Sequence, residues 1–142
     1  MNEMQRRDMG QLVLDAEEMI RTFFPPRGKS QGDEKGKLED RGKTQLSNAI
    51  DAITQSMSIE VFTNWVCYQT ARDDKQNPFW KVSHNQQTFG VAVANYANSL
   101  KKKYADKPSE AVFQLTLFLG FLRRAFIAKD YLGAISGEAK ES

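Results

Sequence analysis

Apolar residues recur every three or four positions along much of the chain, the spacing that places side chains on one face of an α-helix. In the first segment, residues 1–24, this spacing is shared by Met9, Leu12, Val13, Ala16, Ile20 and Phe23. Pro25 and Pro26 end the pattern, because proline lacks a backbone N–H and restricts the residue before it. The pattern therefore predicts an N-terminal amphipathic helix.

Residues 25–43 break this periodicity. The segment, PPRGKSQGDEKGKLEDRGK, has dense mixed charge, several glycines and Leu38 as its only large apolar residue. Such a composition buries too little apolar surface to offset the entropy lost on ordering. We therefore predict a flexible charged linker, which would leave the first helix semi-independent or would become ordered on a partner.

Helical spacing returns in the rest of the chain. We predict helices starting at Thr44, at Ser58 as a capping residue, near His84 or Asn85, and at about Pro108, the last of them running to about Lys129. This last helix is apolar on most of its faces, as expected at the centre of a bundle or in an interface. No run alternates for long enough to predict a strand.

These elements predict an all-α fold, a compact bundle of about five helices with a mobile linker after the first. The chain has 142 residues, close to the common size of one domain. We expect a helix at 1–24, the linker at 25–43, the bundle domain at 44–133, and a disordered tail at 134–142.

The cysteine and hydropathy patterns indicate a cytoplasmic protein. Cys67 is the only cysteine, so no internal disulfide can form, which fits a reducing compartment. Its position in the middle of a predicted helix favours a buried, inert thiol. The most apolar stretch, residues 111–122, is shorter than the roughly 20 residues that cross a bilayer, so we expect no membrane partner.

The residue inventory offers little for catalysis. The chain has one histidine, His84, and one cysteine, too few for a Cys/His metal site. Neither phosphate-binding glycine motif occurs. The acidic pair Asp73 and Asp74 is adjacent in sequence, so on a helix its carboxylates would diverge; a solvated face or a cap is the simpler interpretation. We therefore predict a protein that is not an enzyme and has no metal or cofactor.

The distribution of charged and aromatic residues favours a binding function. Residues 61–142 hold eleven Lys/Arg and seven Asp/Glu, a net charge of +4 that can attract a phosphate backbone. The candidate RNA-binding residues are Lys43, Arg72, Lys75, Lys81, Arg123 and Arg124. Trp65 and Tyr68 could stack on bases, but their spacing with Phe62 and Val66 also fits a buried helix face.

Three segments resemble the small helical subunits of type III CRISPR effector complexes. They are Thr44-Gln45-Leu46-Ser47-Asn48-Ala49-Ile50, Phe62-x-x-Trp65-Val66-x-Tyr68-Gln69-x-Ala71-Arg72, and Phe118-Leu119-Gly120-Phe121-Leu122-x-Arg124. The resemblance covers roughly residues 43–130, and Ser47 and Asn48 stand where the family commonly has an arginine.

The resemblance implies a non-catalytic role in RNA-guided antiviral defence. Such subunits pack against copies of themselves and other subunits of a ribonucleoprotein complex, and contact the guide RNA and target RNA through basic side chains. It places RNA contacts at Lys43, Arg72 and Arg124.

A second interpretation follows from the apolar last helix. A helical protein–protein adaptor or inhibitor would use this surface, together with the first helix, to bind one protein without any affinity for nucleic acid. The two interpretations differ in whether the isolated protein binds RNA in a salt-dependent way.

Overall fold

A computed structural model describes residues 3–26 and 32–134 and confirms the all-α fold. Its helices are α1 (Glu3–Phe23), α2 (Gly32–Ser56), α3 (Ile59–Ala71), α4 (Phe89–Lys103) and α5 (Pro108–Ile127), followed by the 3₁₀-helix η1 (Lys129–Ala134). A short antiparallel hairpin, β1 (Ser83–His84) and β2 (Gln87–Thr88), precedes α4. Within the described ranges, no helix is long and apolar enough to cross a membrane.

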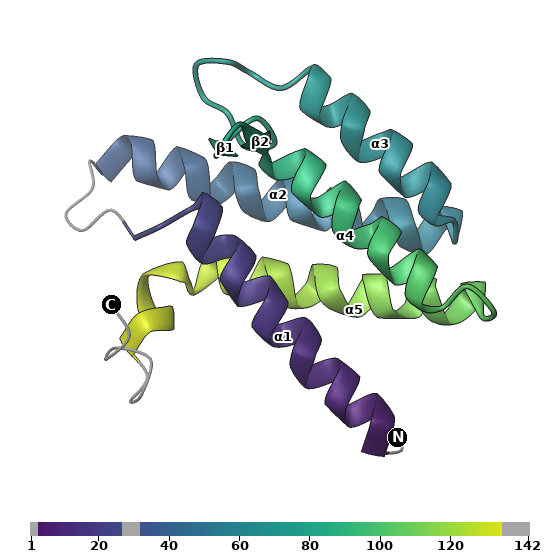
Figure 1. Ribbon diagram of the computed structural model, residues 1–142. Coiled ribbons are helices and arrows are strands. Elements are labelled where there is room, and N and C mark those ends of the chain that lie inside the picture. Colours follow the sequence, from purple (N-terminus) through teal and green to yellow (C-terminus); the bar gives the residue numbers. More distant parts are fainter. Residues whose placement is uncertain (1–2, 27–31, 135–142) are drawn as a thin grey trace.

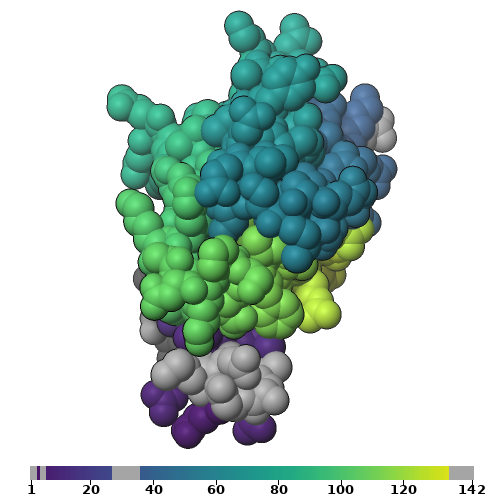
Figure 2. Space-filling model, turned by 90° about the vertical axis from the view of Figure 1, so that its right-hand side faces the viewer, coloured from purple at the N-terminus to yellow at the C-terminus, as the bar shows by residue number. Residues whose placement is uncertain are grey.

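Helix α5 lies at the centre of the bundle. It packs against α1 on one side and α2 on the other, while α3 packs on α4 and on α2 (Figure 1). Its buried residues are Ala111, Val112, Gln114, Leu115, Phe118, Leu119, Leu122, Ala125 and Phe126. Figure 2 views the end of the molecule where the α2–α3 and α4–α5 connections lie, with the first turns of α1 in purple below them.

Local capping explains where the helices begin. The Ser58 hydroxyl accepts a hydrogen bond from the Val61 N–H at 3.1 Å, as predicted, and Pro108 opens α5. Helix α4 begins at Phe89, after Thr88 as its cap, and not near His84 or Asn85. The residues before it form the hairpin, whose turn places Asn85 and Gln86 at φ of 50° and 67°.

The predicted linker is wrong over residues 32–43, which form the first part of α2; residues 27–31 lie outside the described ranges. Contacts that are distant in sequence hold this part of the helix. Gly42 lies so close to the Phe126 ring that a Cβ would overlap it. The buried Lys129 ammonium forms an ion pair with Glu39 at 3.3 Å. At least one charged side chain of this segment therefore stabilises the fold by pairing with a distant residue.

Helix α1 belongs to the same core and is not semi-independent. Leu12, Ala16 and Ile20 are buried, and α1 packs along α5. The boundary at residue 44 is therefore wrong, because the bundle includes α1 and the start of α2. The predicted tail from residue 135 onward lies outside the described residues.

Aromatic rings join the loop after α3 to the core. Phe79 and Trp80 are buried, and the Phe79 ring centroid lies 5.4 Å from Phe24, 5.3 Å from Phe89 and 5.6 Å from Phe126. Aromatic pairs at these separations stabilise a fold beyond their buried area. The loop is consequently fixed against the bundle, and it brings Trp80 to the space between α2 and α3.

Candidate binding groove

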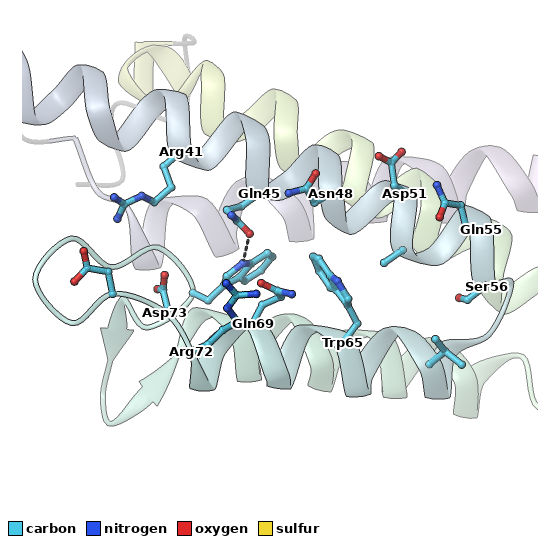
Figure 3. A pocket seen from close by; sticks show the side chains of 14 residues that line it. Arg41, Gln45, Asn48, Asp51, Gln55, Ser56, Trp65, Gln69, Arg72 and Asp73 are labelled. Atoms are coloured by element: carbon cyan, nitrogen blue, oxygen red, sulfur yellow. Dashed lines mark hydrogen bonds between the residues drawn. The ribbon is translucent and has the colours of Figure 1, made fainter.

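Helices α2 and α3 run in opposite directions and enclose an open groove of about 880 Å³, called here the α2–α3 groove (Figures 1 and 3). This volume lies within the range of small-molecule sites. The lining residues are Arg41, Gln45, Asn48, Asp51, Ala52, Gln55, Ser56, Val61, Trp65, Gln69, Arg72, Asp73, Asp74 and Trp80.

Two tryptophans form the apolar part of the groove. Trp80 is only 1% exposed, and its indole N–H donates to the Gln45 side-chain oxygen at 2.9 Å. Trp65 is half-buried and meets Trp80 edge-to-face, with centroids 6.1 Å apart and planes at 86°. The buried Trp80 ring therefore forms the fixed base of the groove. Part of the Trp65 ring remains accessible to a ligand.

Side-chain amides line both walls. Asn48 and Gln55 project from α2 and Gln69 from α3 (Figure 3). Within residues 3–26 and 32–134, none of these three side chains has a hydrogen-bond partner. Each amide offers two N–H donors and a carbonyl acceptor. The groove can therefore hydrogen-bond a ligand that carries donors and acceptors side by side.

Two arginines reach the same end of the groove from opposite walls. Arg41 projects from α2, and Arg72 is the capping residue at the end of α3 (Figure 3). The Arg72 guanidinium lies 5.7 Å from the centroid of the exposed Tyr68 ring. In the described part of the chain, Arg72 has no carboxylate partner at ion-pair distance.

Asp73 positions the loop that carries Trp80. One carboxylate oxygen accepts the Phe79 N–H at 2.7 Å and the Lys81 N–H at 2.9 Å. The Lys81 ammonium donates to the Asp73 carbonyl oxygen at 3.0 Å. Both backbone donors come from residues further along the loop, so the Asp73 carboxylate holds the start of the loop against its end. Asp73 is therefore not part of a solvated acidic pair.

Asp74 makes a more local contact. Its carboxylate accepts the Gln76 N–H at 2.9 Å, and this hydrogen bond, with a smaller contribution from the charge of Arg41, lowers the Asp74 pKa. A side-chain oxygen bonded to the N–H two residues later is typical of turns that begin with Asp. Asp74 therefore stays ionised at neutral pH beside Arg41.

The predicted RNA-binding residues fall into two groups. Arg72, Lys75 and Lys81 belong to the end of α3 and its following loop, close to the groove. Lys43, Arg123 and Arg124 lie where α2 meets α5: the Arg123 side chain donates to the Lys43 carbonyl oxygen at 3.3 Å. Arg124 is exposed, with its guanidinium 5.8 Å from the Phe121 ring centroid.

Sequence reasoning missed the groove-lining roles of Gln45, Asn48 and Gln55. In the sequence these amides form a row beside the apolar stripe of α2. This row indicates a binding surface only when the position of α3 opposite it is known. Cys67 was expected to be buried, but it is exposed, because the buried face of α3 is formed by Ile59, Phe62, Val66 and Thr70.

Among the described residues, no three His, Cys, Asp or Glu side chains group together as metal ligands would. Neither a protein-family profile, a curated protein sequence nor a solved structure matches the chain.

Proposed function

We propose that the protein is a non-catalytic small subunit of a cytoplasmic, RNA-guided type III CRISPR effector complex, where it packs against neighbouring subunits and contacts the guide–target RNA backbone. The observation that supports this proposal best is the presence of Arg41 and Arg72 on opposite walls at the same end of the α2–α3 groove. Two guanidinium groups from opposite walls can hold phosphate oxygens of one strand in bidentate hydrogen bonds.

The nearby carboxylates leave this end of the groove able to attract phosphate. Asp73 and Asp74 accept backbone N–H groups, so part of the hydrogen-bonding capacity of their oxygens is already used within the loop. Lys75 and Lys81 add two cations to the same loop. Because the Lys81 ammonium already donates to a carbonyl oxygen, Arg72 should contribute more to RNA binding than Lys81.

The second cationic group has a more structural role. Lys43 and Arg123 are half-buried. The Arg123 side chain connects α5 to α2 through the backbone carbonyl oxygen of Lys43, so substitution of Arg123 would loosen that contact. Arg124 is the exposed member and is the residue of this group that can reach RNA. The resemblance in sequence supports contacts at Lys43, Arg72 and Arg124, and the structure favours Arg72 and Arg124 among them.

Fluorescence anisotropy with labelled single-stranded RNA tests the proposal. We expect binding that weakens steeply between 50 and 200 mM salt, and Arg41→Ala/Arg72→Ala should reduce the slope of log K against log[salt] by about 0.7 for each phosphate that the variant no longer neutralises. Lys102→Ala, at the exposed end of α4, is the matched control. Absence of binding at low salt would contradict direct RNA contact.

Assembly requires a separate experiment in cells. Affinity purification of the tagged protein should recover a ribonucleoprotein that contains a CRISPR guide RNA and other effector subunits. Recovery of the protein with no RNA, whatever the salt concentration, would contradict the proposed complex.

One observation favours the alternative adaptor function. Phe113 and Ile127 on α5 are 49% and 45% exposed, and the half-buried Leu117 lies on the same helical face. Exposed apolar side chains on one helical face are typical of a protein-binding surface. A stable complex with one protein partner and no RNA, abolished by Phe113→Asp, would support this alternative.

A further inference from the structure

The α2–α3 groove continues beyond the two arginines, and contact with an RNA backbone would leave the rest of it unused. Along the groove, Arg41 and Arg72 lie at one end, Trp65 and Gln69 follow, and Asp51 and Gln55 lie towards the other end (Figure 3). An aromatic wall and amides that have no hydrogen-bond partner among the described residues distinguish this part of the groove from the arginine end.

We propose that this part of the groove binds one unpaired nucleotide of an RNA strand, with an adenine stacked on Trp65 and its edge hydrogen-bonded by side-chain amides. The inference rests on the proposed RNA-binding function and deepens it, because it assigns a base to a site where the proposed function requires only a phosphate.

Trp65 is suited to stacking because its ring is held in place yet remains partly open. Phe62 lies 6.2 Å away at an interplanar angle of 31°, and Trp80 contacts it edge-on. Trp80 cannot take this role, because its ring is buried and its N–H is bonded to Gln45. Aromatic side chains of this kind are common stacking platforms for unpaired bases.

The amides can pair with the N6/N7 edge of adenine. Gln69 lies one helical turn after Trp65, on the same face of α3, and Asn48 projects from the opposite wall. An amide presents a donor and an acceptor together, which matches the N7 acceptor and N6 donor of adenine. Guanine presents two acceptors on that edge, which fit a guanidinium group better than an amide.

The charges orient the nucleotide in the groove. At one end Arg41 and Arg72 stand beside Asp73 and Asp74, so positive charge is present there, whereas Asp51 is the lining charge towards the other end and repels a phosphate. With the phosphate at the arginines, the base enters towards Trp65. A base inside a duplex keeps both faces stacked on its neighbours, so the site selects an unpaired nucleotide.

The test compares labelled oligo(A), oligo(U) and oligo(C) RNA on the full-length protein by anisotropy. We expect oligo(A) to bind at least about fivefold more tightly than the others, as the lower end of the usual discrimination by a bidentate amide–adenine pair implies. Trp65→Leu should remove this preference, and Gln69→Ala should reduce it with the tryptophan in place. Phe113→Ala, which removes an exposed ring of α5 that does not line the groove, should retain it.

Circular dichroism of each variant establishes that the fold is retained, and Gln69→Ala keeps the test decisive should Trp65→Leu unfold. Equal affinities for the three RNAs, unchanged in Gln69→Ala, would overturn the adenine site and leave the proposed backbone contact standing. Failure of all three RNAs to bind at low salt would overturn both the site and the RNA-binding function.

Discussion

Glycine residues inside helices show how individual contacts shape this fold. A Cβ on Gly90 would overlap the hydroxyl of Thr70, and a Cβ on Gly42 would overlap the Phe126 ring. Gly120, by contrast, has no atom within 4 Å of the position that a Cβ would occupy. Glycine therefore permits the α3–α4 and α2–α5 contacts, whereas at position 120 the described fold does not require it.

Gly90→Ala should destabilise the protein by about 1–3 kcal/mol, because the buried Thr70 has little room to move. Gly120→Ala, the matched control, should stabilise it by roughly 0.5–1 kcal/mol, since alanine is the better helix former. Urea denaturation measures both effects. Thr70→Ala should recover part of the stability that Gly90→Ala removes; equal effects at positions 90 and 120 would contradict the proposed overlap.

At the scale of elements, two tyrosines connect α4 to α1. The Tyr96 hydroxyl donates to Asp15 at 2.7 Å and the Tyr104 hydroxyl to Asp8 at 2.8 Å. Burial, and secondly the hydrogen bond to Asp8, raise the pKa of Tyr104 to about 12, and burial together with the hydrogen bond to Asp15 raises the pKa of Tyr96 further. Both phenols therefore hold their protons more tightly in the folded state.

This difference predicts a loss of stability at high pH. Above the ordinary tyrosine pKa of 10.0 the unfolded chain releases protons that the folded chain retains, so the free energy of unfolding should fall as pH rises from about 10 to about 12. Urea midpoints measured across this range check the prediction. Tyr104→Phe should flatten the dependence, and an identical slope in the variant would show that Tyr104 is not responsible.

At the scale of the whole molecule, α1 shares one core with the other helices. Leu12 is 3% exposed and lies on the face of α1 that contributes to the core, whereas Leu14 on the opposite face is 54% exposed. Because Phe24, the residue directly after α1, also stacks on Phe79, the helix is connected to the loop beside the groove. Unfolding of α1 should therefore accompany unfolding of the entire bundle.

Leu12→Ala should lower the free energy of unfolding by about 2–5 kcal/mol, the usual effect of deleting a buried leucine side chain. Leu14→Ala, in the same helix, should change it by less than about 0.5 kcal/mol. Circular dichroism and tryptophan fluorescence should report one coincident transition in both variants. A separate early loss of helix before the fluorescence change would show that α1 unfolds on its own.

The sequence determined the features that depend on neighbouring residues. Helical periodicity identified the all-α fold, and Ser58 and Pro108 marked helix starts because capping and proline effects act within one turn. Arg72 was recognised as a candidate RNA-binding residue from its charge and its local sequence. The charge of a residue alone, however, could not show that Arg72 is more available to RNA than Lys81. The Lys81 ammonium donates to the Asp73 carbonyl oxygen within the loop.

Tertiary structure decided what depends on residues distant in the chain. The start of α2 appeared too polar to fold, but it is helical where Gly42 meets Phe126 and Glu39 meets Lys129. The α2–α3 groove likewise exists because the two helices run in opposite directions and the loop places Trp80 against Gln45. Local propensity contains no information on such pairings, since their free energy arises from packing and hydrogen bonds that form only in the folded chain.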